Sequence, residues 1–578
     1  MSVVRPAGLL LLAAGAGAWA QALPSAGSIL RQQELSAPRR ADQLSGRGPA
    51  VAPRPALDAS GVRVRLKSVR FTDAGALAST QELAALVQDA IGKELTSAQL
   101  LQLADRVTNH LRAKGWFLAR GYLPQQDVTD GDLEIAILAG RLQGGVDGIT
   151  VGGNPARLSP ARVRGTLAAA LQDGGDADVH AGDLERGLLL LNELPGISAH
   201  SLLERGSGPD STRMTIDVKE APLTAGSSVG LDNFGGRYTG EHRATGQLRL
   251  NDLAGEGDGA TLGAAASRGL GQVSAGYALP LGFRGLNLSA SASALDYRIG
   301  KELAPLDLNG RALTAGLRLA YPIVLGTRSN LRASLAYDTR ALADKGAGLT
   351  LRDKRVTSWT LGLGGERIDA QWGGGATSYA VALVAGKADL SRVAADLAAD
   401  QAGPRVNGSY AKWTFALARV QRLQGPFSLQ AALSGQGASR NLDPSEKFIL
   451  GGSSGVRAYP AGEGAGDSGT LLRTELRYDA PAAPALGSLQ VLAFADAGHV
   501  TLNRDVWGPG AVTNATGRNA YGLAGWGIGI EAARSGRHAL QLAWAQRIGG
   551  NPGRSPAGND SDGRADRGRL LLQAIFQL

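Results

Sequence analysis

The chain has no cysteine in its 578 residues, and only 5% of them are aromatic. The lack of cysteine excludes a disulfide scaffold and any metal site built on thiolates. Beyond the N-terminal segment there is no run of about 18 apolar residues, so the sequence predicts no transmembrane helix. If the protein lies in a membrane, it must do so as a closed β-barrel, because only closure satisfies the hydrogen bonds of every strand.

Charge and motif content exclude several function classes. The formal net charge is +9, but the cations are scattered among the anions, so we expect no nucleic-acid partner. The six histidines lack paired metal-ligand spacing, and we expect neither metal nor cofactor. Gly466-Asp467-Ser468-Gly469 copies the nucleophile sequence of trypsin-like proteases, but it falls in a predicted loop and lacks a histidine context. The sequence therefore predicts a protein that is not an enzyme.

The N-terminus has the pattern of a sorting signal. Arg5 precedes a short apolar stretch that ends near Ala16, and small residues follow at Ala18 and Ala20. This pattern predicts a secretory signal peptide at residues 1–20. Residues 21–36 contain a short polar helix, and residues 37–61 form an extended linker that contains Pro and Arg.

Two α/β modules are predicted next, at residues 62–142 and 143–222. The first is expected to have the order strand, helix, helix, strand, strand at residues 62–71, 81–91, 97–113, 117–123 and 133–138. The second repeats that order at residues 148–151, from Ser159–Pro160 onward, at 182–193, 197–204 and 212–218. Each module would hold a three-stranded sheet, and an open sheet edge can capture an extended partner. The alternative is that the modules are structural spacers.

From residue 225 to residue 578 the pattern alternates with period two. Leu472, Thr474, Leu476 and Tyr478, for example, alternate with charged residues at 473, 475, 477 and 479. About sixteen such segments, separated by Gly, Asp and Asn turns, predict a transmembrane barrel. A large soluble β-sandwich array is the alternative, but it would bury its apolar faces.

One glycine-rich stretch, residues 451–459 (GGSSGVRAY), interrupts this block. It carries Arg457 within a predicted lumen loop at about 437–469, whereas Asp496 lies in a mostly apolar strand, Phe494-Ala-Asp-Ala-Gly498. Arginine can bind a carboxylate through two parallel hydrogen bonds, so we expect Arg457 to pin the loop to the wall at Asp496. Glu475, on the lumen face between two arginines, is a second candidate partner.

Taken together, these segments resemble the outer-membrane transporters of two-partner secretion, which belong to the Omp85 superfamily and include the haemolysin and filamentous haemagglutinin secretion proteins. The resemblance covers essentially the whole mature chain. It is carried by Val456-Arg457-Ala458-Tyr459, by Phe494, Asp496 and Gly498, by Asp232-Asn233-Phe234-Gly235, and by Gly121-Tyr122-Leu123-Pro124-Gln125 in the first module.

The resemblance implies a protein of the Gram-negative outer membrane whose two modules are periplasmic POTRA domains. They would bind the N-terminal secretion domain of an exoprotein and pass it unfolded through the barrel, without nucleotide hydrolysis. The N-terminal helix would plug the pore. The implied partners are that exoprotein, the outer-membrane lipids and the barrel-assembly machinery. A barrel-assembly factor of the same superfamily is the alternative, although such factors carry more POTRA repeats.

The sequence departs from the family pattern at two positions. Ala458 replaces the glycine of the loop motif, which would cost about 1 kcal/mol if the backbone there needed a positive φ. Leu578 replaces the usual terminal aromatic residue, so recognition during barrel assembly would depend on Phe576.

Overall fold

The computed structural model describes residues 23–36, 63–75, 77–153, 155–171, 179–208 and 211–578. The predicted signal peptide and the linker lie outside these residues. The helices are α2 (Ala26–Ser36), α3 (Thr80–Val87), α4 (Ser97–Ala113), α5 (Pro160–Leu171), α6 (Ala181–Asn192) and α7 (Ala394–Ala402). None of the described helices is both long enough and apolar enough to cross a membrane.

The first module contains a three-stranded sheet in the order β2–β5–β4 and a separate pair, β1–β3. These strands are β1 (Arg63–Arg65), β2 (Ser68–Thr72), β3 (Glu94–Thr96), β4 (Arg120–Tyr122) and β5 (Asp132–Leu138). Helix α4 has the predicted bounds and the predicted capping box between Thr96 and Gln99. Its buried leucines belong to the same hydrophobic cluster as Leu133, Ile135 and Ile137 of β5.

Two predicted strands of this module are wrong in extent. The strand expected at 62–71 is split into β1 and β2, because the backbone changes partner there: Leu66 bonds to Lys93, and Lys67 bonds to Gly131. The strand expected at 117–123 shrinks to β4. Phe117 and Leu118 instead turn aside and pack against the core of the second module, so the two modules share apolar contacts.

The second module has four strands rather than the expected three: β6 (Arg141–Leu142), β7 (Thr150–Gly152), β8 (Ile197–Arg205) and β9 (Ser211–Glu220). Strand β6 falls within the range assigned to the first module, yet it pairs in parallel with β9. The sequence missed it because two residues are too few to show a period. Within the described residues, β8 pairs with β9 alone, so its other edge is open.

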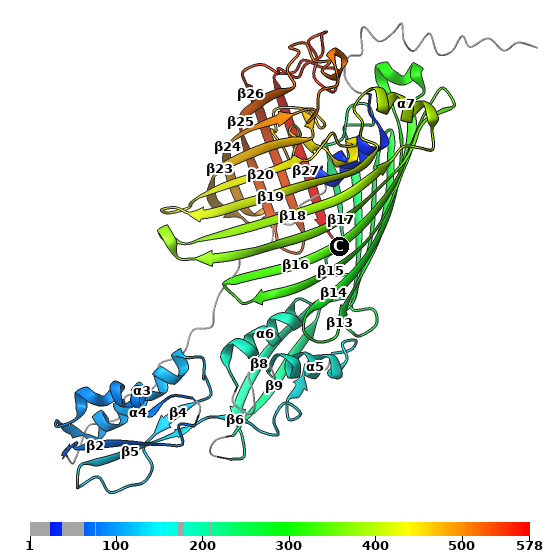
Figure 1. The fold of residues 1–578 in the computed structure, drawn as a ribbon. Helices are drawn as coiled ribbons and strands as arrows, with labels where there is room; N and C mark the ends of the chain where they lie inside the picture. Colours follow the sequence, from blue (N-terminus) through cyan, green and yellow to red (C-terminus); the bar gives the residue numbers. More distant parts are fainter. Residues whose placement is uncertain (1–22, 37–62, 76, 154, 172–178, 209–210) are drawn as a thin grey trace, which may run out of the picture.

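The remainder of the chain forms a closed barrel of sixteen strands, which confirms the predicted architecture and excludes the sandwich (Figure 1). Its strands are β10 (Ser228–Asp232), β11 (Arg243–Asn251), β12 (Gly259–Ser267), β13 (Leu270–Leu281), β14 (Leu286–Arg298), β15 (Asn309–Leu325), β16 (Ser329–Gly346), β17 (Leu349–Asp369), β18 (Gly375–Asp389), β19 (Gly408–Arg422), β20 (Phe427–Ala438), β23 (Ser468–Ala483), β24 (Gly487–Thr501), β25 (Ala520–Arg534), β26 (His538–Ile548) and β27 (Gly568–Gln577). Every neighbouring pair is antiparallel, and β10 closes the barrel against β27.

The period-two alternation sorts side chains between the membrane face and the lumen. Leu472, Leu476 and Tyr478 are exposed on the outer face, whereas Glu475 is buried on the inner face. Phe576 is exposed near the end of β27, and Leu578, which follows the strand, is also exposed. Helix α7, a short helix in the connection between β18 and β19, was also not predicted.

The second module lies against the turns of the barrel near its end, whereas the first module lies farther away (Figure 1). Ser159 donates its backbone N–H to the carbonyl of Gly255 at 2.8 Å, and Arg162 pairs with Glu256 at 2.8 Å. Glu220 accepts the backbone N–H groups of Ala156, Arg157 and Leu158, and these bonds hold the loop in place. Burial alone would raise the pKa of Glu220, but these hydrogen bonds lower it below the usual range of a glutamate.

Candidate functional site

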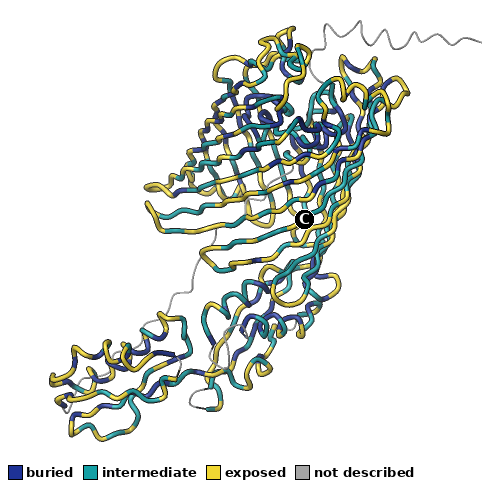
Figure 2. Tube along the Cα trace, in the orientation of Figure 1, coloured by how far each residue is buried: buried dark blue, intermediate teal, exposed yellow. Residues whose placement is uncertain are grey.

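Residues 439–467, between β20 and β23, do not extend into solvent but fold back into the lumen. They include the two short strands β21 (Phe448–Ile449) and β22 (Ala465–Gly466), which pair with each other. Arg457 and Tyr459 rank among the largest fully buried side chains of the described residues. Figure 2 shows buried segments gathered inside the barrel, at the end opposite the two modules. We call residues 439–467 the lumen loop.

Arg457 is the centre of a buried ionic contact between the lumen loop and the barrel wall. Its guanidinium donates to both carboxylate oxygens of Asp496, at 2.8 and 2.7 Å, and to Glu475 at 2.7 Å. The backbone N–H of Arg457 adds a third hydrogen bond to Asp496, at 3.2 Å. The guanidinium carbon lies 3.5 Å from the ring centroid of Phe494, so the cation also stacks on an aromatic face. The structure thus places Arg457 against both candidate partners together.

Burial gives this contact its strength. The side chains of Arg457, Asp496 and Glu475 are only 2%, 1% and 8% exposed. Removal of one partner from such a site leaves a charge uncompensated, which costs about 3–5 kcal/mol in a dry protein interior and less where water enters. Arg457 is therefore a buried residue of the loop and not a solvated one.

The remaining motif residues shape the contact surface between loop and wall. An added Cβ at Gly498 would lie 2.4 Å from the side chain of Leu450, so only glycine lets the loop approach there. Val456 and Ala458 are fully buried, and the methyl group of Ala458 faces Gly525 of β25. Ala458 is not among the described residues with positive φ, so its methyl group adds no backbone strain. The guanidinium of Arg547 lies 4.7 Å from the ring centroid of Tyr459.

Three further polar anchors hold the loop, two of them ion pairs, and none was predicted from the sequence. Loop residues Asp443, Glu446 and Glu463 contact, in order, Lys354, Lys412 and Asn551 of the wall and outer loops. Lys354 in β17 and Lys412 in β19 occupy lumen-facing positions of the period-two pattern. Two buried cations on that face were a signal that acidic residues of another segment pair with them. The Gly-Asp-Ser-Gly sequence has a similar role: Asp467 is buried and accepts from Lys447 and the backbone of Arg504.

Helix α2, within the range predicted for the plug helix, lies inside the barrel. Ala26, Ile29 and Leu30 are buried against an apolar lumen surface that includes Tyr297 and Leu342. Asp344 of β16 accepts the N–H of Ala26 at 2.7 Å, which places a carboxylate at the positive N-terminus of the helix.

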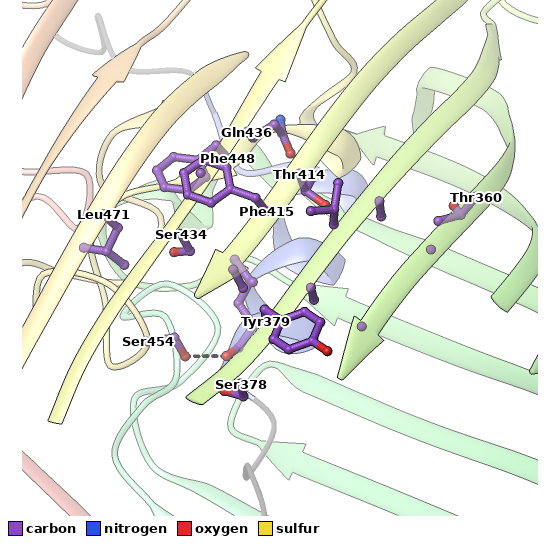
Figure 3. Close-up of a pocket in the computed structure, with 18 of the residues that line it drawn as sticks. Thr360, Ser378, Tyr379, Thr414, Phe415, Ser434, Gln436, Phe448, Ser454 and Leu471 are labelled. Atoms are coloured by element: carbon purple, nitrogen blue, oxygen red, sulfur yellow. Dashed lines mark hydrogen bonds between the residues drawn. The ribbon is translucent and has the colours of Figure 1, made fainter. Parts of the chain in front are cut away.

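The other face of α2 contacts the lumen loop. Arg31 donates to the carbonyl of Lys447 at 3.2 Å, and Gly27 packs against Ser445. At the end of the helix, the hydroxyl of Ser454 donates to the carbonyl of Leu35 (Figure 3). The helix and the loop therefore form one body that fills part of the lumen.

A cavity of about 960 Å³ remains beside this body. It lies between α2, the glycine-rich tip of the lumen loop and the wall made by β16 to β20, and it includes Tyr379 and Phe415 (Figure 3). Elsewhere, the described residues contain no group of three or more histidines and carboxylates suited to a metal ion.

The motif of the first module lies in a different domain and does not approach the lumen loop. Gly121 and Tyr122 belong to β4, and Leu123, Pro124 and Gln125 follow it. An added Cβ at Gly121 would lie 3.0 Å from the carbonyl of Ala104, so glycine lets β4 pack closely against α4. Within the described residues, this motif thus has a visible packing role and no contact with the barrel.

Comparison with known proteins agrees with this architecture. The family model "Haemolysin secretion/activation protein ShlB/FhaC/HecB" matches residues 210–532, and a ShlB-type POTRA domain model matches residues 64–140. The chain belongs to this family. The transporter is accordingly an outer-membrane β-barrel with periplasmic POTRA domains, and the family acts in two-partner secretion.

Individual relatives share about a quarter of their residues with the transporter. It is 26% identical over 471 residues to the heme/hemopexin transporter protein HuxB of Haemophilus influenzae. The aligned region covers 79% of this chain and 80% of HuxB. It is 26% identical over 443 residues to the outer membrane transporter CdiB of Dickeya dadantii, covering 75% and 76%. The solved structure of CdiB from Escherichia coli has the same fold, with a TM-score of 0.67 at 19% identity, covering 91% and 93%.

We predict that Arg457→Ala detaches the lumen loop while the barrel still inserts. The variant leaves Asp496 and Glu475 buried without their main cation, at a cost of up to about 3–5 kcal/mol. Protease cleavage within residues 451–466, measured on outer membranes, should rise at least tenfold, and export should fall by a similar factor. Arg318→Ala is the control, because Arg318 is a lumen arginine that donates to Ser334 rather than to the loop. Wild-type cleavage in Arg457→Ala would contradict the role of the contact.

We also predict that Asp344→Ala loosens the plug helix. Loss of a carboxylate that binds a helix N-terminus typically costs about 1 kcal/mol, which corresponds to a roughly fivefold increase in the population with α2 displaced. Single-channel recordings in planar bilayers should show more frequent openings of large conductance. Asp353→Ala is the matched control, since Asp353 of β17 is half-buried and pairs with Arg392 of an outer loop rather than with α2. Equal open fractions in the two variants would argue against this anchor.

Proposed function

We propose that the transporter captures one partner exoprotein in the periplasm and passes it, unfolded, through its own barrel to the cell surface. The observation that carries this proposal is the content of the lumen. It is filled by two parts of the same chain: the lumen loop, which connects β20 to β23, and α2, which is held there by noncovalent contacts to the wall and the loop. A pore closed by a separable element is suited to intermittent passage of a large substrate.

Capture of the exoprotein is assigned to the open edge of β8. This strand is nine residues long and ends in Leu202, Leu203, Glu204 and Arg205, all of them exposed. An extended segment of the exoprotein can pair with that edge by backbone hydrogen bonds, while its side chains meet the exposed leucines. The second module lies beside the barrel turns, so a segment bound there would be close to the entrance (Figure 1).

The route through the lumen follows the wall formed by β17 to β20. Many of the lumen-facing residues that line the cavity on this wall are small, among them Thr360, Gly362, Ser378, Ala380, Thr414 and Ser434, whereas Glu366 and Gln436 are larger. The Arg457 contact lies on the next two strands of the wall, β23 and β24. Once α2 has moved, an extended polypeptide can therefore pass along the cavity-lining residues of β17 to β20. Its passage would leave the contact between Arg457 and Asp496 intact.

The energy for export would come from folding of the exoprotein outside the cell. The sequence contains no GxxxxGK[ST] nucleotide-binding motif, so nothing in it indicates nucleotide hydrolysis. A chain that folds after it leaves the pore cannot return, and its folding free energy then makes transport directional.

We expect a disulfide between Gly27→Cys and Ser445→Cys to stop export. An added Cβ at Gly27 would lie 3.2 Å from the Cβ of Ser445, near the separation of about 3.8 Å found in disulfides. The natural chain has no cysteine, so the pair has no competing partner. Secretion of the exoprotein encoded beside the transporter should be lost under oxidising conditions and return with reductant. Both single variants serve as controls, and undiminished secretion by the cross-linked protein would refute passage past α2.

Leu202→Asp should weaken capture of the exoprotein at least tenfold, measured as the Kd of its N-terminal secretion domain for the full-length transporter in detergent. Leu202 is 55% exposed, so the substitution leaves the core of the module intact while placing a charge on the open edge. Leu101→Asp is the matched control, because Leu101 is 44% exposed but lies on helix α4. Equal weakening by both variants would show that the edge of β8 is not the binding surface.

A further inference from the structure

The outer face of the barrel carries a patch of positive charge near the end that lies away from the two modules (Figure 1). The alternation of each strand identifies the side chains on this face. In β17, for example, Lys354 is buried in the lumen, so the next residue, the exposed Arg355, points outward. By the same alternation, each of five consecutive strands directs an exposed cation outward: Arg298 (β14), Arg311 (β15), Lys345 (β16), Arg355 (β17) and Lys387 (β18). We call these five residues the basic patch.

Exposed tryptophans on the same outer face mark the level where lipid tails meet headgroups. They are Trp359 (β17), Trp413 (β19), Trp526 (β25) and Trp544 (β26). Arg355 lies four residues beyond Trp359 in the direction away from the modules, which is about 13 Å along the strand and reaches the headgroups. At the same place relative to the other three tryptophans, the chain has Ser409, Gly522 and Ile548. The basic patch is therefore a feature of the β14 to β18 side and is not repeated on β19, β25 or β26.

The carboxylates of this face do not neutralise the basic patch. Arg311 lies 3.5 Å from Asp296, and both side chains are more than half exposed; the other four cations of the patch form no ion pair within the described residues. Asp353 is already paired with Arg392 at 3.2 Å, and Asp389 accepts a backbone N–H two residues along the chain at 3.0 Å. Like charges on neighbouring strands repel one another, so an anion from outside the chain would stabilise the patch.

We propose that the basic patch binds the headgroup of a phosphorylated, multiply acylated glycolipid of the outer leaflet, the chemistry of the lipid A part of lipopolysaccharide. The modules are periplasmic, so the opposite end of the barrel, where the patch lies, faces the outer leaflet (Figure 1). Arginine binds phosphate through two parallel hydrogen bonds, and lysine binds it as a point charge.

The width of the patch favours a headgroup with several phosphates. From β14 to β18 it crosses four strand spacings, or about 19 Å, which is more than a single phosphate can contact. Nearer the middle of the membrane, the exposed side chains of Trp359, Leu361 and Leu383 provide an apolar surface for the acyl chains. The inference does not depend on the proposed route of export.

Binding of purified, fluorescently labelled lipopolysaccharide to the full-length transporter in detergent tests this site. The double variant Arg355→Gln with Lys387→Gln removes two exposed cations from adjacent strands and should raise the Kd at least tenfold. Lipopolysaccharide whose phosphates have been removed should bind the unaltered transporter at least tenfold more weakly, because the patch then has no anion to contact. Phosphatidylglycerol, which has one phosphate, should also bind at least tenfold more weakly.

The matched control is Arg328→Gln with Arg367→Gln, which removes two exposed cations at the periplasmic end of β16 and β17. It should leave the Kd for lipopolysaccharide within twofold. An unchanged Kd in the patch variant, or an equal loss in the control, would overturn the site. Equally tight binding of phosphatidylglycerol would assign the patch to an anionic phospholipid and overturn the glycolipid. Folding of each variant is checked by heat-modifiable migration. If the double variant does not fold, Arg355→Gln and Lys387→Gln are measured singly, with an expected loss of at least threefold each.

Discussion

The buried guanidinium of Arg457, shared between Asp496 and Glu475, fixes the lumen loop to the barrel wall, and the rest of the lumen is arranged around it. With the loop in place, Ser445 and Lys447 present the surface on which α2 rests. The helix in turn reaches Asp344 at one end and Arg243 at the other. The lumen loop and α2 are thus held in the pore by a series of polar contacts, and the position of the loop determines where the helix binds.

A closed barrel in a membrane imposes the opposite constraint on its two faces. The outer face must be apolar for the lipid, so charge can be placed only in the lumen, where burial makes each ionic contact strong and each unpaired charge costly. The cations of the inner wall, Lys354 and Lys412, are therefore matched by the acidic residues Asp443 and Glu446 of the loop. On the same strands, many of the residues that line the cavity are small and uncharged, such as Thr360, Ser378 and Thr414.

Regular, long-range features of the fold were predictable from the sequence. Helix α4 has the expected bounds because its capping box and apolar face agree, and the barrel follows from an alternation repeated sixteen times. The errors concern very short strands and a strand whose backbone changes its hydrogen-bonding partner part-way along. β6 has two residues and shows no period, and the strand at 62–71 was divided because Leu66 and Lys67 bond to different partners. The sequence could name Arg457, Asp496 and Glu475 as candidates, since a lone cation in a glycine-rich loop and carboxylates on inward positions are visible in the pattern.

The sequence by itself determined the architecture, the separation of lipid-facing from lumen-facing residues and the chemistry that could join the loop to the wall. Only the tertiary structure decided that Arg457 takes both carboxylates, that Asp443, Glu446 and Glu463 are further anchors, and that Gln33 meets Arg243. Periodicity is a local property and reveals which way a side chain points. Which partner it meets depends on the register and closure of strands far apart in the chain: Gln33 and Arg243 are 210 residues apart.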